Sequence, residues 1–211
     1  MRALATSHRF LEMPESNTQS DTDSNAVDVA LMRRIAAGDE NAFRELVERH
    51  QNAVIGTIAK MLRDPTEAED LAQQTFLRVW KHAKRWKPDA KFTTYLYTIA
   101  RNLVYNESRR RSRKREVSGD EREEDSGKQI PSDLKHSPDA EVSQAESHQE
   151  IDAVIASLPE TQRTAVILYA YESLSYEEIG QVLGTSVSSV KSLMFRARST
   201  LRDKLGHMLG Y

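Results

Sequence analysis

Hydrophobic residues recur with the period of an α-helix along most of the chain. Between residues 186 and 205, one apolar stripe falls within about 60° of Val190 on a helix turning 100° per residue. The stripe contains Val190, Met194, Ala197, Leu201 and Leu205. The same period predicts two helices in 29–61 and single helices in 64–86, 91–115, 158–172 and 174–184. No strand-like alternation persists beyond a few residues, so the sequence predicts an all-α protein.

Glycine, proline and short polar residues predict where these helices begin and end. Gly38 is expected to end the first helix of the 29–61 segment, and Asp39 is expected to cap the second. Asp64 followed by Pro65 predicts the start of the next helix, with Glu67 placed to complete a capping box.

Three helices close to the carboxyl end form a more specific pattern. Ser175 and Glu178 form a capping box, Gly184 suits a turn with positive φ, and Ser186 can cap the helix that follows. Two helices joined by so short a turn are typical of a helix-turn-helix, whose second helix can lie in the major groove of DNA. The 158–172 helix, with Pro159 near its first turn, would pack against both.

The outward side of the 186–205 helix carries hydroxyl groups, cations and one aromatic ring. These residues are Ser188, Lys191, Ser192, Phe195, Arg196, Ser199 and Arg202. An amphipathic surface helix with solvated charges would give the same pattern in isolation. The preceding helix and tight turn favour a DNA-binding helix instead.

Charge is distributed unevenly along the 211 residues, although the net charge is only −2. Residues 28–115 hold 19 Lys and Arg against 11 Asp and Glu, a net charge of +8. Residues 116–149 hold 3 against 10, a net charge of −7, and contain almost no large apolar residues. The sequence therefore predicts a disordered tail over 1–27, helical domains over 28–115 and 150–211, and an acidic flexible linker over 116–149.

A basic and aromatic face is expected on the 91–115 helix. Opposite its core stripe lie Thr94, Tyr95, Thr98, Arg101, Asn102 and Tyr105, and six cations stand among the seven residues 109–115. A solvated basic helix end is the alternative. Aromatic rings among cations favour single-stranded DNA, because bases stack on the rings while phosphates attract the cations.

The composition narrows the class of protein further. The chain has no cysteine, no apolar run of about 20 residues and no signal peptide, so we expect a cytoplasmic protein without disulfides or membrane insertion. Stabilisation by the helix dipole accounts for Glu67, Glu69 and Asp70 in the first turns of the 64–86 helix, so these carboxylates do not require a metal site. Scattered histidines and the absence of a nucleotide-binding or nucleophile motif predict no enzyme, no cofactor and no metal site.

Two regions of the chain, in this order, resemble bacterial extracytoplasmic-function (ECF) sigma factors. The strings that carry the resemblance are "GDENAFRELVERH", "DPTEAEDLAQQTFLRVWKH", "FTTYLYTIARNLVYNESRRR" and "LPETQRTAVILYAYESLSYEEIGQVLGTSVSSVKSLMFRARSTLR". The resemblance implies a region-2 domain for core polymerase binding, −10 recognition and melting, and a region-4 domain for −35 recognition. The partners would be double-stranded and melted promoter DNA and the RNA polymerase core, through its β′ clamp helices and β subunit.

The resemblance also implies roles for single residues. Core polymerase contacts would be Asp70, Gln73, Phe76 and Trp80. For the −10 element the resemblance implies Trp86, Tyr95 and Asn102. The outward arc and the basic end of the 91–115 helix add further −10 candidates, which are Thr94, Thr98, Arg101, Tyr105, Arg109 and Arg110. The −35 candidates are Ser188, Ser189, Lys191, Ser192, Phe195, Arg196, Arg198 and Arg202. The chain departs from the family pattern at Gln74, where many members have glutamate, and at Leu193, where many have arginine.

A self-standing helix-turn-helix regulator is the alternative function. Such a regulator would usually dimerise on a palindrome, whereas this sequence offers no evident dimer interface or effector pocket and would leave the 28–115 domain unexplained. Many ECF sigma factors are held inactive by an anti-sigma factor, and a flexible linker would let one wrap both domains.

Overall fold

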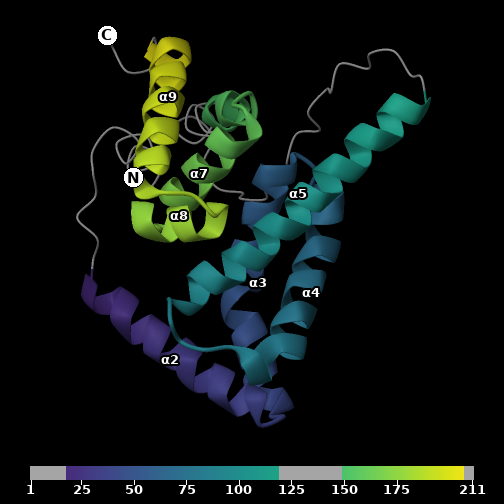
Figure 1. Cartoon of the computed structure of the whole chain (residues 1–211), viewed down its shortest axis with the longest axis vertical. Coiled ribbons are helices and arrows are strands. Elements are labelled where there is room, and N and C mark those ends of the chain that lie inside the picture. Colours follow the sequence, from purple (N-terminus) through teal and green to yellow (C-terminus); the bar gives the residue numbers. More distant parts are fainter. Residues whose placement is uncertain (1–17, 119–148, 207–211) are drawn as a thin grey trace, which may run out of the picture. The chain divides into compact units, whose positions relative to one another are not determined.

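The computed structural model describes residues 18–118 and 149–206, and every regular element within these two ranges is a helix (Figure 1). The predicted all-α class is confirmed. The chain divides into two compact units, one containing α2 to α5 and the other containing α7 and α9.

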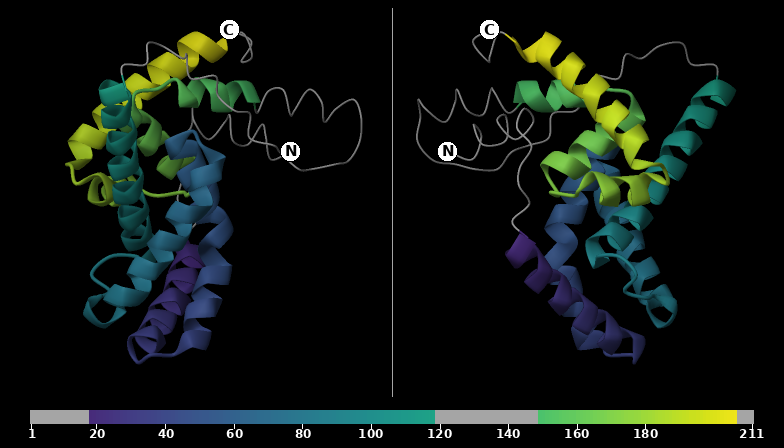
Figure 2. Two further views of the ribbon diagram at one scale, coloured as in Figure 1. Left: turned by 90° about the vertical axis from the view of Figure 1, so that its right-hand side faces the viewer. Right: turned by 60° about the vertical axis from the view of Figure 1, so that its left-hand side comes forward.

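The amino-terminal unit packs four long helices around one core. They are α2 (Thr18–Ala36), α3 (Glu40–Leu62), α4 (Pro65–His82) and α5 (Phe92–Ser118), with a short 3-10 helix, η1 (Ala83–Arg85), after α4. Helix α3 packs against α2 and α4, and α5 packs against α3 and α4 (Figure 2). Fully buried side chains from all four helices fill the centre, among them Met32, Leu46, Ile58, Val79, Phe92 and Leu96.

The predicted caps at Asp39 and Asp64 are confirmed. Gly38 adopts a φ of +94°, and the Asp39 carboxylate accepts hydrogen bonds from the backbone N–H groups of Asn41 and Ala42 at 2.9 and 3.1 Å. Asp64 caps α4 by accepting from the Thr66 N–H at 2.9 Å, with Pro65 at the first helical position. Short polar side chains therefore satisfy N–H groups that the first turns leave unpaired.

Helix α2 begins earlier than expected. It starts at Thr18, inside the segment predicted as a disordered tail, and residues 1–17 lie outside the described part of the chain. The buried Asp28 carboxylate accepts from Arg49 Nε at 3.0 Å, and the Asn25 side-chain oxygen accepts from the Phe92 N–H at 2.9 Å. These contacts with α3 and α5 stabilise a polar stretch that cannot bury much apolar surface.

The carboxyl-terminal unit is a smaller helical bundle. It comprises a helix over residues 149–156, α7 (Glu160–Ala170), α8 (Tyr176–Leu183) and α9 (Val187–Leu205). Helix α7 is buried from Arg163 to Ala170 and packs against α9. All five residues of the predicted α9 stripe are buried, so the predicted helical face is confirmed.

The turn between α8 and α9 depends on two glycines. Ser175 and Glu178 form the predicted capping box at the start of α8, and Ser186 caps α9 by accepting from the Ser189 N–H at 3.3 Å. Gly184 adopts a φ of +66°. At Gly180 an added Cβ would lie 2.9 Å from the Thr185 carbonyl oxygen. The two helices can approach this closely only because residue 180 has no side chain.

An ion network joins the start of α4 to the basic end of α5. The Arg111 guanidinium lies 2.9 Å from the Asp64 carboxylate, 2.8 Å from that of Glu67 and 3.2 Å from that of Glu107. Arg110 also donates two hydrogen bonds to Glu107, at 2.8 and 2.7 Å. The Arg110 bonds, followed by those of Arg111, lower the pKa of Glu107 to about 2. Glu67 thus pairs with arginine rather than serving mainly as a cap.

We expect Gly180→Ala to destabilise the carboxyl-terminal unit by about 1–3 kcal/mol, because the new methyl group meets backbone that cannot rotate away. Hydrogen exchange of the α7 and α9 amides would measure the loss. The control is Gly56→Ala on α3, where an added Cβ meets nothing within 4 Å and the helix gains up to about 1 kcal/mol. Equal protection of α9 in wild type and Gly180→Ala would contradict the packing described.

We expect Glu107→Gln to lower the unfolding free energy of the amino-terminal unit at pH 7 by about 1 kcal/mol, after solvent screening of the ion pairs. The folded-state pKa of Glu107 lies below its ordinary value of 4.5. Its stabilisation is therefore complete above about pH 4.5 and is lost as the pH falls toward 2.

Urea unfolding at pH 7 and pH 3.5 would test this, followed through Trp80 and Trp86 in the same unit. The wild type should lose more stability than Glu107→Gln between these pH values. Glu48→Gln, on an exposed glutamate of α3, is the matched control. Parallel pH profiles for wild type and Glu107→Gln would show that the network does not stabilise the fold.

Candidate nucleic-acid interface

The outward face of α9 combines exposed cations with an exposed aromatic ring. Phe195 is 76% exposed, and it lines one hollow with Lys191, Ser192 and Arg196. The side chains of Lys191 and Arg196 make no hydrogen bond or ion pair with any described residue. A solvated phenylalanine costs free energy in the isolated protein, so its place among unpaired cations indicates a binding surface.

The serines at the start of α9 are already hydrogen-bonded to one another. The Ser186 hydroxyl oxygen lies 2.9 Å from that of Ser188 and 3.0 Å from that of Ser189, and Ser192 donates to the Ser188 carbonyl at 3.1 Å. Ser188, Ser189, Ser192 and Arg202 are all exposed, as expected. The hydroxyl groups of the three serines lie beside Lys191 in the first two turns, the part of a recognition helix that meets base edges.

Arg198 is oriented differently from the other −35 candidates. Its guanidinium donates to the Tyr176 hydroxyl at 2.9 Å and lies 5.8 Å from the centre of the Tyr169 ring. Its Nε atom is buried without a hydrogen-bond partner among the described residues. The side chain packs within its own unit and braces α9 against α7 and α8, and the expected phosphate contact stays a prediction.

Helix α5 presents the expected polar face in its middle turns. Asn102 and Tyr105 are exposed, and Thr98 and Arg101 are half-buried. The Tyr105 ring lies between two guanidinium groups, 5.2 Å from that of Arg101 and 5.7 Å from that of Arg109. Such a face suits a single strand of DNA, because its bases can stack on the aromatic rings and its negatively charged phosphates attract the cations.

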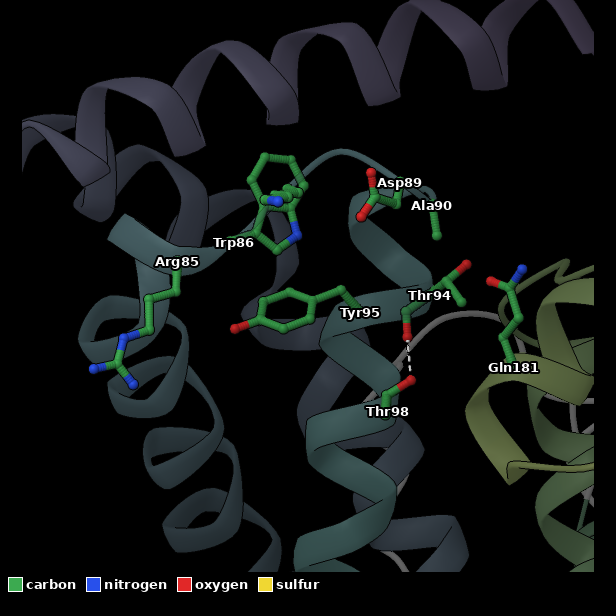
Figure 3. Close-up of a pocket in the computed structure, with 9 residues that line it drawn as sticks. Arg85, Trp86, Asp89, Ala90, Thr94, Tyr95, Thr98 and Gln181 are labelled. Atoms are coloured by element: carbon green, nitrogen blue, oxygen red, sulfur yellow. Dashed lines mark hydrogen bonds between the residues drawn. The ribbon is translucent and has the colours of Figure 1, made fainter.

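Thr94 does not belong to this exposed face. It is only 2% exposed, and its hydroxyl oxygen has no hydrogen-bond partner among the described residues. Its backbone carbonyl accepts a hydrogen bond from the Thr98 hydroxyl at 2.7 Å (Figure 3). The expected outward position of Thr94 is corrected, because the apolar stripe of α5 is wider than its periodicity indicated and also buries Tyr97.

Three aromatic rings meet where the chain enters α5. Trp86 lies 6.4 Å from Phe92 and 6.3 Å from Tyr95, measured between ring centres, and Phe92 lies 6.4 Å from Tyr95. Phe92 is buried, while Trp86 and Tyr95 are half-buried. Burial raises the pKa of the Tyr95 hydroxyl, so this group remains protonated. Phe92 therefore holds two partly exposed rings in place.

The basic end of α5 divides into paired and unpaired cations. Arg110 and Arg111 are bonded to carboxylates, as described above. Arg109 contacts the Tyr105 ring, and Lys114 is exposed; neither is ion-paired with a described residue. Arg110 was expected among the DNA contacts, yet both of its hydrogen bonds go to Glu107. Arg109 is thus the freer of the two candidates.

The exposed face of α4 differs from the expected set at one residue. Asp70 and Gln73 are exposed, and Trp80 is half-buried with its ring 5.0 Å from that of Phe43. Phe76 is only 5% exposed, so its assignment as a surface anchor is corrected. It points into the core with the apolar stripe of α4.

Leu77 is the apolar residue that the sequence interpretation missed. It is 52% exposed and lies within about 60° of Asp70 and Gln73 around α4. The signal was present in the sequence, because a leucine opposite a buried stripe has no packing role within its own unit. Asp70, Gln73, Leu77 and Trp80 are called the α4 face below.

The described ranges contain neither a metal-binding cluster nor a membrane-spanning helix. No group of three or more His, Asp or Glu side chains there is placed to hold a metal ion. None of the described helices is long and apolar enough to cross a membrane.

Family models and curated relatives match this chain in both halves. Residues 46–114 match Sigma-70 region 2, and residues 148–201 match Sigma-70 region 4. The RNA polymerase sigma-H factor of Pseudomonas aeruginosa is 33% identical over 185 residues, covering 86% of this chain and 95% of that protein. The ECF RNA polymerase sigma factor SigW of Bacillus subtilis is 33% identical over 182 residues, covering 82% and 94%.

Solved structures agree with this assignment. The sigma factor RpoE of Bartonella quintana, crystallised with the anti-sigma factor NepR, is similar with a TM-score of 0.60 and 25% identity, covering 78% of this chain and 96% of that one. A second solved structure, CnrH in complex with the cytosolic domain of CnrY, shares the fold with a TM-score of 0.60 at 24% identity, covering 86% of this chain and 98% of that one. The chain belongs to the ECF sigma factors, the promoter-specificity subunits that bind core RNA polymerase and start transcription.

Proposed function

We propose that this sigma factor divides its work among three faces, on α9, α5 and α4. The observation that carries the proposal is the exposed Phe195 ring flanked by the unpaired cations Lys191 and Arg196 on the second helix of a helix-turn-helix. The buried stripe of α9 fixes which side of the helix is available, so this face is the one that can enter the major groove.

The α9 face would recognise the −35 element. Lys191 and Arg196 can donate to guanine acceptors, and Phe195 can contact a thymine methyl group or a sugar. Ser188, Ser189 and Ser192 would contact base edges or phosphates near the start of the helix, and Arg202 would meet a phosphate farther along. Arg198 would act indirectly, by fixing α9 against Tyr176.

The α5 face would recognise and melt the −10 element. Trp86 and Tyr95 provide stacking surfaces, Asn102 offers an amide to an extruded base, and Tyr105 with Arg101 and Arg109 would follow the strand. Unstacking a base costs a few kcal/mol, and binding to such a face returns about 1–3 kcal/mol for each stacked base. Melting would therefore be driven by binding, without ATP hydrolysis and without catalysis by this chain.

The α4 face would bind core polymerase at the β′ clamp helices, with further contacts to the β subunit. Asp70 and Gln73 supply polar contacts, while Leu77 and Trp80 supply apolar surface. Leu77 takes the place that Phe76 was expected to fill.

The domain limits also belong to the proposal. We retain 150–211 as region 4 and extend region 2 from 28–115 to begin at Thr18, because α2 contacts α3 and α5. The acidic segment 116–149 would connect the two, although most of it lies outside the described residues.

An anti-sigma factor is a further proposed partner, because the Bartonella relative was crystallised with one. The bacterial cytoplasm is the proposed place of action.

We expect Leu77→Ser to weaken binding to core RNA polymerase about 3- to 10-fold, because burying half of a leucine side chain contributes roughly 1 kcal/mol. Titration of core polymerase with labelled protein would measure the affinity, and abortive transcription from a promoter would report the assembled holoenzyme. Val27→Ser, on an apolar residue of α2 that is 41% exposed, is the matched control.

Unchanged core affinity in Leu77→Ser would remove Leu77 from the interface. Two results together would instead favour a self-standing regulator. The chain would bind a palindromic DNA tightly without core polymerase, and a mixture of the chain with core polymerase would transcribe no promoter.

We expect Lys191→Ala to weaken binding of the holoenzyme to a −35 duplex. A lost phosphate contact would lower the slope of log affinity against log salt by about 0.9, whereas a lost base contact would relax preference at one base pair by about 1–3 kcal/mol. Lys204→Ala is the control, because Lys204 lies in the last turn and donates to Ser157 at 2.9 Å. If neither the slope nor the preference changes, Lys191 does not touch DNA.

A further inference from the structure

A buried carboxylate of α2 lies against two basic side chains of α3. Asp28 is only 1% exposed, and one of its oxygens accepts from Arg49 Nε at 3.0 Å. Its other oxygen lies 3.0 Å from His50 Nε2. That ring nitrogen is buried and makes no aligned hydrogen bond with any described residue, so the Asp28 carboxylate is the charge that its position serves.

The imidazole of His50 continues this contact into the aromatic cluster at the start of α5. Its ring centre lies 5.3 Å from that of Phe92, with the two planes tilted by 53°. Phe92 is fully buried and lies 6.4 Å from both Trp86 and Tyr95. All these distances fall in the range of favourable ring pairs. A continuous line of contacts therefore runs from Asp28 to two half-buried rings.

Helix α2 also holds the backbone of the same segment. The Asn25 side-chain oxygen, one turn before Asp28, accepts from the Phe92 N–H at 2.9 Å. Helix α2 packs against η1 as well, the element directly before Trp86. Figure 3 shows Trp86 and Tyr95 close together beside the first turns of α5. The segment that carries the rings is thus fixed from α2 at both of its ends.

Stability alone is a weak explanation for so polar a cluster. A buried ion pair contributes little net stability, because the cost of removing its charges from water offsets their attraction, but it can fix one arrangement of the groups around it. Phe92 has no exposed surface, so its ring can influence a partner only through its neighbours. Fixed rings bind more tightly than mobile ones, since ordering a mobile side chain on binding costs free energy.

We propose that His50 is a positioning residue for the −10 strand. Held beside Asp28, its ring supports Phe92 and so fixes the planes of Trp86 and Tyr95 before a base arrives. His50 is only 12% exposed and acts from behind Phe92, without touching DNA. This inference rests on the proposed −10 role of the two half-buried rings, and it gives α2 and α3 a part in strand binding.

The first measurement is made on the free chain. His50→Gln keeps a side chain that can donate to Asp28 but removes the ring that packs on Phe92. In a Trp80→Phe background, Trp86 is the only tryptophan of the chain. We expect His50→Gln to shift Trp86 emission to longer wavelength and to increase its quenching by acrylamide, because the indole loses the support of Phe92.

The second measurement uses holoenzyme assembled from core polymerase and the full chain, without the Trp80→Phe change. The probe is a short labelled single strand carrying the −10 sequence of a promoter that this holoenzyme transcribes. We expect His50→Gln to weaken strand binding about 5-fold, the lower end of what stacking on one base contributes. The slope of log affinity against log salt should not change, because no phosphate contact is removed. Core affinity should also stay the same.

Arg49→Gln is the matched control, because Arg49 is the other α3 partner of the same carboxylate. Its guanidinium also donates to the Ser24 hydroxyl at 3.2 Å, on α2 rather than in the aromatic cluster. Arg49→Gln should lower the urea stability of the amino-terminal unit at least as much as His50→Gln does. It should leave Trp86 quenching and strand affinity at their wild-type values.

The positioning role is overturned if His50→Gln keeps wild-type quenching and strand affinity. It is also overturned if strand affinity falls in proportion to stability in both variants, since His50 would then serve the fold alone, or if the salt slope falls, since a phosphate contact would then be lost. These results leave the proposed −10 role intact. If wild-type holoenzyme binds the −10 strand no better than a scrambled strand, the −10 role itself fails, and the positioning role fails with it.

Discussion

Burial of one apolar stripe on each short helix is the constraint on which the rest of the structure depends. A helix as short as the 8-residue α8 is marginal in water on its own, and the longer helices also take most of their stability from packing, so each must bury one side against its neighbours. In α9 the stripe from Val190 to Leu205 is buried, which leaves only the opposite side of the helix available to a partner. Burial of the apolar stripes of α4 and α5 likewise leaves Leu77 and Asn102 exposed on the outer sides of these helices. Two small units can therefore present three outward faces, on α4, α5 and α9.

Electrostatics then decides which cations remain available. Arg110 and Arg111 are bonded to Glu107, Asp64 and Glu67, and thereby attach the basic end of α5 to the start of α4. Arg109, Lys191 and Arg196 have no such partner among the described residues and can meet phosphates or bases. A count of positive charges along the sequence does not distinguish the two kinds of arginine, because the distinction depends on carboxylates from another helix.

Local features of the fold followed from the sequence, and long-range ones did not. The caps at Asp39, Asp64 and Ser175 and the stripe of α9 depend on residues within one or two turns, which periodicity and capping rules describe. The true orientations of Phe76 and Arg198 depend on contacts with other helices. Periodicity fixes only the centre of a buried stripe, so residues at its edge, such as Thr94, fall on the side that the neighbouring helix determines.

The hydrogen bond from the Phe92 N–H to Asn25 joins residues 67 positions apart. Helix α5 thus takes part of its N-terminal cap from a helix made much earlier during synthesis, and closing so long a loop costs more entropy than a local cap does. Helix α5, proposed to meet the −10 element, has this cap only when α2 is packed against it. A nascent or partly unfolded chain is therefore unable to present a finished strand-binding surface, which couples promoter recognition to completion of the whole amino-terminal unit.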